Sequence, residues 1–370
     1  MILRPFALLA GLLWLPVTAW AGQPLRLQGQ LWGTITGGDD PAPGFRPHAE
    51  LVGYIPTLSL ARELPRGRLI DLEWAYRAGW ATTGLDSTGS NTTFGRHHRL
   101  WARYSSPALE LRFGLQKIAF GPGRILRPLA WFDNIDPQDP TNQTDGVNAL
   151  RLRFFPSANL ALWSWVVISD QWDYYSPGVR VEATLPLGEV GVTWYDHRQS
   201  GFHSLGQMPV APLWGHNRRL ALDLRYDGLI GLWTESFVVL PRAASQNPGR
   251  QLFIMLGGDY TFGIGNGLYI MLEQLWLPLP DDDPAGGQQL AALLASWPLG
   301  AFDQLMVILY HDWDNGRTYS YLRWARVYDR TSFNIMVSRN PRRSDYGNQF
   351  LDPNLAGFGT SLNFMVVYNH

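Results

Sequence analysis

One stretch of the sequence decides the fold: Leu69-Ile-Asp-Leu-Glu-Trp-Ala-Tyr-Arg-Ala-Gly-Trp-Ala81. Every second residue from Ile70 onward is apolar or aromatic, whereas the positions between them include Asp71, Glu73 and Arg77. Successive side chains of a β-strand point to opposite faces of a sheet. The stretch is therefore predicted to be a strand with one apolar face and one charged face.

The same two-residue period recurs along the chain, in residues 109–115, 148–154, 179–185 and 219–226. We predict that the strands containing these runs extend to about ten or more residues, as a membrane-spanning strand needs, whereas strands of soluble proteins average about 5–6. Aromatic side chains near the ends of predicted strands are candidates for the girdles of a membrane barrel. They are Trp80, Tyr104, Trp163, Trp165, Tyr226, Trp276 and Trp324.

The connections between the predicted strands are of two kinds. Short joints fall at 105–107, 156–158, 187–188, 227–228, 263–267, 298–300 and 329–330, and long polar stretches at 37–46, 82–95, 119–145, 197–217, 241–250, 279–289 and 340–356. Short turns at one end and long loops at the other are typical of outer-membrane barrels. We expect an all-β, transmembrane, antiparallel up-and-down β-barrel of about 18 strands, with 16 as the alternative count. A secreted β-helix or propeller would show a fixed repeat, which this sequence lacks.

The composition agrees with a membrane barrel. Of the 370 residues, 46% are hydrophobic and only 16% are charged, while soluble domains carry about 25% charged residues. The formal net charge of -1 leaves no basic field for nucleic acid. The absence of Cys excludes disulfide scaffolds, iron–sulfur clusters and Cys-based zinc sites, and no cofactor is expected.

The N-terminus reads as an export signal. Arg4 is followed by an apolar stretch at 6–15 and by the small-x-small triplet Ala19-Trp20-Ala21. This order is typical of a secretory signal peptide. We therefore predict a signal peptide at 1–21 and a barrel at 22–370, with an uncleaved N-terminal anchor as the alternative.

The segment Leu111-Arg-Phe-Gly-Leu-Gln-Lys-Ile-Ala-Phe-Gly121 ends a strand and precedes a long loop rich in Asp and Pro. With the signal peptide and the alternating strands, it resembles Gram-negative outer-membrane porins, in particular the substrate-selective and alginate-export-like porins. The resemblance implies an outer-membrane channel narrowed by an infolded loop. The chain departs from the family by ending Tyr368-Asn-His370 rather than on an aromatic residue, although the strand alternation reaches Tyr368.

The charged faces of the strands are the candidate pore lining. By parity they carry Asp71, Glu73, Arg77, Arg99, Arg103, Glu110, Arg112, Arg151, Arg153, Arg180, Glu182, Arg219, Asp223 and Arg225. A ladder of arginines favours anions. The alternative is that these residues only solvate the lumen and pair with one another.

The stretch from Ala119 to Asp145 exceeds the roughly 12–15 residues beyond which loops are usually functional or disordered. Its candidate constriction residues are Arg124, Arg127, Trp131, Phe132, Asp133, Asp136 and Asp139. The aromatic pair beside Arg and Asp suits guidance of a sugar or an organic acid. The alternative is an outer loop that packs against its neighbours.

The sequence thus predicts a porin for small hydrophilic solutes, anions among them, in contact with outer-membrane lipid and without nucleic acid. Two alternatives stay open: a barrel sheath around a partner such as an exported cytochrome, and a barrel-rim hydrolase. The hydrolase would use His97-His98, Asp196-His197 or His311-Asp312, but no nucleophile accompanies them, so no enzyme is predicted. Asp281-Asp282-Asp283 and the Asp312/Asp314 pair are interpreted as solvated charges rather than metal ligands. A homotrimer and a partner in the lumen are both compatible with the sequence.

Overall fold

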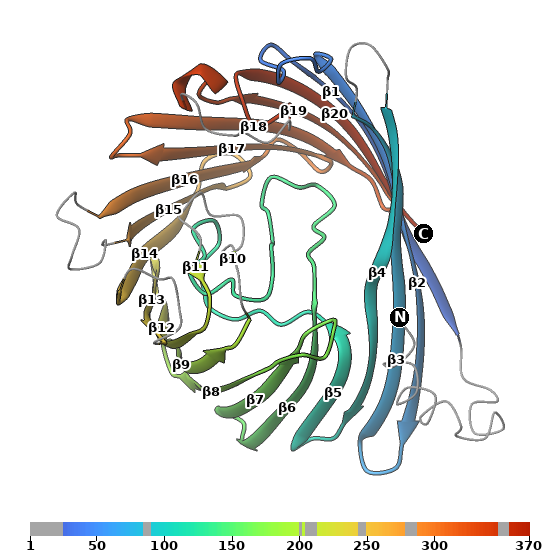
Figure 1. Cartoon of the computed structure of the whole chain (residues 1–370), viewed down its shortest axis with the longest axis vertical. Coiled ribbons are helices and arrows are strands. Elements are labelled where there is room, and N and C mark those ends of the chain that lie inside the picture. The colour runs from blue at the N-terminus through green and yellow to red at the C-terminus, as the bar shows by residue number, and fades with distance from the viewer. Residues whose placement is uncertain are drawn as a thin grey trace.

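The computed structural model describes residues 25–83, 90–199, 202–203, 213–242, 249–277, 287–346 and 355–370. They form an antiparallel sheet of 18 strands that closes on itself, because β1 pairs with both β2 and β20. The predicted signal peptide at 1–21 lies outside the described residues. In Figure 1 the strands are seen as a ring around the interior of the barrel.

The strands of the barrel follow one another in chain order around the ring. They are β1 (Arg26–Gly38), β2 (His48–Leu64), β3 (Arg68–Thr83), β4 (Ser90–Ser105), β5 (Leu109–Gln116), β6 (Val147–Ser157), β7 (Leu160–Ile168), β8 (Tyr175–Leu185), β9 (Gly188–His197), β12 (Asn217–Asp227), β13 (Gly231–Pro241), β14 (Gln251–Phe262), β15 (Leu268–Leu277), β16 (Gln288–Pro298), β17 (Asp303–Asp312), β18 (Arg317–Val327), β19 (Thr331–Arg339) and β20 (Thr360–Asn369). A separate short hairpin pairs β10 (Phe202–His203) with β11 (Leu213–Trp214). The predicted up-and-down barrel of about 18 strands is confirmed.

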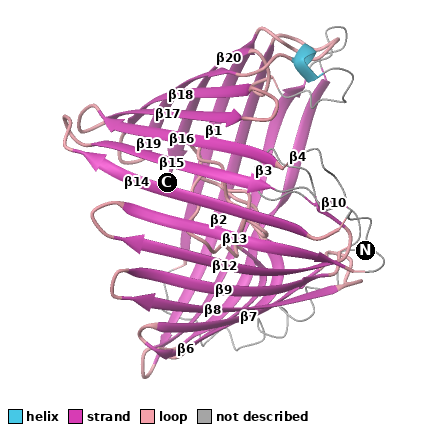
Figure 2. Ribbon diagram, turned by 90° about the vertical axis from the view of Figure 1, so that its left-hand side faces the viewer, coloured by secondary structure: helices cyan, strands magenta, loops and turns pink. Residues whose placement is uncertain are grey.

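Helix is almost absent from the described part of the chain. A 3-10 turn, η2 (Arg343–Tyr346), follows β19. Within the described residues, no helix is long and apolar enough to cross a membrane. In Figure 2 the strands run side by side, with short turns along the left edge and η2 at the upper right.

The outer surface of the barrel is apolar and exposed. Leu256 and Leu272 are 50% and 53% exposed, and similar side chains cover the outer face of most strands. A continuous apolar surface of this kind is suited to lipid. Tyr226, Tyr260 and Tyr328 lie on it near the short turns, where an aromatic girdle is expected.

Two of the predicted girdle residues face the other way. Trp163 and Trp165 on β7 are 9% and 2% exposed, and Trp163 lies opposite Arg153 and Arg180 in the register. They are part of the buried cluster inside the barrel rather than of the lipid-facing surface. The girdle prediction was wrong for both, because apolar residues of the connection between β5 and β6 fill part of the barrel interior and belong to the same cluster.

Candidate functional site

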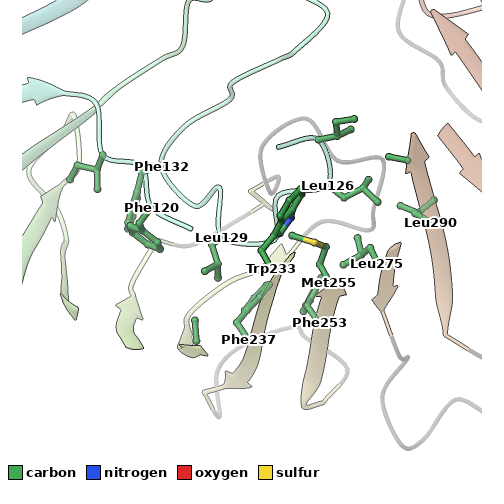
Figure 3. Close-up of a cluster of buried hydrophobic side chains, with 14 of the residues drawn as sticks. Phe120, Leu126, Leu129, Phe132, Trp233, Phe237, Phe253, Met255, Leu275 and Leu290 are labelled. Carbon is green, nitrogen blue, oxygen red and sulfur yellow. The ribbon is translucent and has the colours of Figure 1, made fainter. Parts of the chain in front are cut away.

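The connection between β5 and β6, residues 117–146, lies inside the barrel (Figure 1). We call it the inner loop. Ile118, Phe120, Leu126 and Leu129 of this loop are each 7% exposed or less. Figure 3 shows Leu126 and Leu129 among the side chains of the facing strands, with Trp233, Met255 and Leu275 close by. Burial of these apolar side chains is the driving force that brings the loop inward.

Two glutamates of the wall hold the first half of the inner loop. The Glu273 carboxylate on β15 accepts hydrogen bonds from the backbone N–H groups of residues 124–126 at 2.6–2.9 Å and from Trp233 Nε1 at 3.1 Å. Glu235 on β13 accepts from the backbone N–H groups of Gly123 at 2.7 Å and Leu129 at 3.0 Å. Both glutamates are buried. A buried carboxylate requires such donors, so these contacts fix the loop to the wall.

An aromatic cluster holds the middle of the loop. The Phe132 ring meets Tyr195 edge to face, with ring centroids 4.9 Å apart, and also contacts Phe120 and Trp165. Trp131 stacks on Tyr195 with centroids 5.8 Å apart. Phe132 is buried, so the role of stacking on a passing solute, considered for the aromatic pair, does not fit its ring.

The second half of the loop is tied to other strands. The Tyr321 hydroxyl on β18 donates to the Gln138 carbonyl at 2.8 Å. Gln143 Nε2 donates to Gln30 Oε1 on β1 at 2.8 Å, and Gln143 Oε1 lies 2.9 Å from His98 Nε2 on β4. The inner loop therefore spans the lumen and contacts walls on several sides.

The charged residues predicted on the loop differ in their surroundings. Arg127 and Asp133 form a buried ion pair with each other. Asp139 accepts from the Thr141 backbone N–H at 2.9 Å and so shapes a turn, while Arg124 is held through its backbone. Burial and, secondarily, repulsion from Asp139 raise the pKa of Asp136 above its usual range, although a hydrogen bond from the Gln138 N–H opposes the shift.

Four arginines on the inner face of β4, β5 and β6 form what we call the arginine wall: Arg103, Arg112, Arg151 and Arg153. Asp71 accepts from Arg103 Nε and Nη2 at 2.8 and 2.6 Å. Glu110 accepts from Arg151 Nη2 at 2.7 Å. Four guanidinium groups thus face two carboxylates, which leaves a local excess of positive charge.

The guanidinium groups of Arg112 and Arg153 carry that excess. Arg112 lies over the Trp101 ring at 4.4 Å and reaches Glu110 only at 3.7 Å. Arg153 lies over the Trp163 ring at 4.1 Å and makes no ion pair with a carboxylate of the described residues. A guanidinium group stacked on an aromatic face is held in place, while the N–H groups at its edge can still donate hydrogen bonds.

Other predicted lining residues pair among themselves. Arg180 donates to Asp223 at 2.6 and 2.9 Å and to Glu182 at 3.0 Å. Arg225 pairs with Asp227 at 2.7 Å near a short turn. Arg219 is fully buried, with its guanidinium 5.3 Å from the Trp131 ring.

The remaining predicted residues lie on β3 and β4. Glu73 accepts from Trp101 Nε1 at 3.1 Å, Arg99 donates to the Thr144 carbonyl at 2.6 Å, and Arg77 lies over the Trp32 ring. The structure therefore separates the set into the arginine wall with Asp71 and Glu110, and the group of Arg180, Glu182 and Asp223. Of the others, Arg99 and Arg219 contact the inner loop, whereas Glu73, Arg77 and Arg225 have partners on the wall.

A polar cavity of about 400 Å³ lies between the inner loop and strands β1 to β4. It is lined by Gln28, Gly29, Gln30, Ile55, Thr57, Glu73, Ala75, His98, Arg99, Gln143, Asn369 and His370. Five of these twelve residues carry uncharged amides or a hydroxyl, which a search for charged strand faces does not detect. His98 lies at a register shift between β3 and β4, so simple parity misplaces it.

The rim histidines do not assemble into one site. His98 faces Gln143, whereas His311 Nδ1 on β17 lies 2.9 Å from the Thr318 hydroxyl. Asp312 accepts from the backbone N–H groups of Asp314 and Asn315 at 3.1 Å and so shapes the turn after β17. Among the described residues, no group of three or more His, Asp and Glu is placed to hold a metal ion, and Asp281-Asp282-Asp283 lies outside them.

No family model and no curated protein matches the sequence. Solved structures of bacterial porins do match the fold. Acinetobacter baumannii OccAB1 has 7% identity and a TM-score of 0.62, with 94% of this chain and 96% of that chain covered. Pseudomonas aeruginosa OccD3 (OpdP) has 9% identity and a TM-score of 0.60, covering 94% and 91%. Salmonella typhi OmpF, solved with daunomycin, has 10% identity and a TM-score of 0.52, covering 94% and 98%.

Identities this low speak for the fold alone. The sequence-based resemblance to porins is confirmed at that level: this chain has the fold of the bacterial outer-membrane porins.

Proposed function

We propose that this protein is an outer-membrane channel through which small hydrophilic solutes diffuse, with a preference for anions. A barrel of this strand number is wide enough for an aqueous lumen, unlike one of about eight strands, which side chains fill. The inner loop takes up part of that width. The polar cavity beside β1 to β4 supports a route for solutes past the loop.

The observation that carries the anion preference is the unequal pairing of the arginine wall. Two carboxylates, Asp71 and Glu110, serve four guanidinium groups. Arg112 and Arg153 are positioned by Trp101 and Trp163 rather than by full ion pairs. Fixed positive charge along a pore wall raises the local concentration of anions.

The two alternative functions have less support. A sheath around a partner protein needs an empty lumen, whereas residues 117–146 already occupy this one. A rim hydrolase needs a nucleophile beside a histidine and an orienting carboxylate. Within the described residues, His98 contacts the Gln143 amide and His311 contacts the Thr318 hydroxyl, and neither histidine has a hydrogen bond to a carboxylate that would orient it. A homotrimer stays a prediction, which cross-linking in detergent tests.

The test is conductance of the refolded protein in a planar bilayer, with the reversal potential measured across a salt gradient. Stepwise channels whose reversal potential has the sign of anion preference support the proposal. Stepwise channels with cation preference refute the role of the arginine wall but still support a channel. A folded barrel without conductance refutes the channel itself.

A further inference from the structure

A cluster of charged residues lies where β9 ends, where β12 begins and just past the end of β13, next to the long connections of these strands. We call Asp196, Arg198, Arg218 and Arg242 the rim cluster. Asp196 lies opposite Arg218 in the register, and the next outward pair is Trp194 and Leu220. Both of these are exposed on the apolar outer surface, so the rim cluster faces outward as well.

One carboxylate serves all three arginines of the rim cluster. The Asp196 side chain is 2% exposed and lies 2.8 Å from Arg198 Nε, 3.0 Å from Arg242 Nη2 and 3.9 Å from Arg218 Nε. The three arginine side chains are 35–55% exposed. Among the described residues, their ion pairs go to Asp196 alone. The cluster therefore presents two uncompensated positive charges at the surface.

The rim cluster borders the apolar band directly. Trp194, Leu220 and Leu240 are exposed just below it on the same strands, on the side of the membrane-spanning surface. Trp is enriched where acyl chains meet headgroups. The guanidinium groups consequently lie at the depth of lipid headgroups, and an amphiphile seated here would rest its chains on the leucines.

We propose that the rim cluster binds the phosphate of an outer-leaflet lipid. Arginine matches phosphate geometry through paired N–H donors, and basic clusters at the membrane surface bind anionic headgroups. Asp196 positions the guanidinium groups and neutralises only one of their three charges. The adjoining apolar surface favours a phosphorylated lipid over free phosphate, since only the lipid contacts both. This inference concerns the outside of the barrel and is independent of the proposed channel.

The experiment compares binding of diphosphoryl lipid A and of its dephosphorylated form to the full-length protein in phosphatidylcholine nanodiscs. Binding is read by native mass spectrometry of the released complex. We expect the diphosphoryl form to be retained. The double variant Arg218→Gln with Arg242→Gln should weaken that binding about thirtyfold, because each interfacial arginine contributes about fivefold.

A matched control, Arg339→Gln with Arg342→Gln, removes two exposed arginines elsewhere at the same end of the barrel. Arg339 lies on the outer face of β19, and Arg342 follows that strand. The control should bind as the wild type does. Asp196→Asn should tighten lipid binding, since it removes the competing carboxylate. Equal binding by the wild type and the rim double variant, or equal loss in the control, overturns the proposal. Full competition by inorganic phosphate at the same affinity assigns the cluster to free phosphate and overturns the lipid assignment.

Discussion

Glu273 on β15 accepts a 2.6 Å hydrogen bond from the backbone N–H of Leu126, 147 residues earlier in the sequence. The bond joins the inner loop to the wall, and the same carboxylate takes two more N–H groups from residues 124 and 125. Leu126 packs beneath it into the buried cluster of Figure 3. Polar and apolar anchors thus coincide at one point of the loop.

Removal of this anchor should loosen the inner loop. In Glu273→Ala, three backbone N–H groups, two of them buried, lose their acceptor, at a cost of about 1–3 kcal/mol for each buried one left unsatisfied. We expect larger and noisier single-channel currents, with the barrel still folded because its strand pairing is untouched. Glu50→Ala is the control, since Glu50 is exposed beside Ile35 on the outer face. Quiet currents of wild-type size in Glu273→Ala would contradict the anchoring role.

The barrel could be predicted from sequence where its two faces differ in polarity. In β3 and β5, charged inner positions alternate with apolar outer ones, so parity places Asp71 or Arg112 directly. The signal weakens in β14 to β17, because Met255 and Leu290 face inward and pack under the inner loop. There both faces are apolar, and periodicity alone cannot separate them.

The loop anchors could not be predicted for a related reason. Glu235 and Glu273 are single acids in apolar strands, and their partners are backbone N–H groups more than 100 residues away. Every residue except proline has a backbone N–H, so residue type does not show which of these groups will bind a carboxylate. The loop itself was detectable by its length, but the burial of Phe132 and the pairing of Arg127 with Asp133 depend on its folded course.

Neutralisation of the arginine wall should remove ion selectivity. In Arg112→Gln with Arg153→Gln, the carboxylates Asp71 and Glu110 then balance the two remaining arginines. The reversal potential in a salt gradient should move most of the way to zero at unchanged channel size. Arg339→Gln, on the lipid-facing side, should leave the reversal potential unaltered. A double variant that keeps the wild-type potential would assign the selectivity to other residues.

The raised pKa of Asp136 predicts a pH dependence. Burial favours the protonated form, so this carboxyl gains its proton before exposed carboxyls as the pH falls. Its folded-state pKa lies above the unfolded value, so the related stabilisation of the loop is present at low pH and is lost as the pH rises through the folded pKa. We therefore expect anion preference to increase on mild acidification, when the lumen loses one negative charge.

Asp136→Asn isolates this effect. The variant should show the wild-type low-pH selectivity at all pH values and lack the mildly acidic step. Asp139→Asn serves for comparison, since it removes a neighbouring negative charge and should lower the midpoint of the step. A step of unchanged midpoint and size in Asp136→Asn would rule out this carboxyl as its source.

The cavity beside β1 to β4 can be tested as a route because the chain has no cysteine of its own. Thr57 lines the cavity, and the adjacent Leu58 pairs with Leu27, which is exposed on the outer face. A negatively charged thiol reagent should therefore react with Thr57→Cys and reduce its conductance, since the added group occupies part of the passage. Leu58→Cys, facing lipid, should show no such block. A positively charged reagent of similar size should react more slowly with Thr57→Cys if the arginine wall repels cations. Equal currents before and after complete labelling of Thr57→Cys would show that solutes cross the barrel by another path.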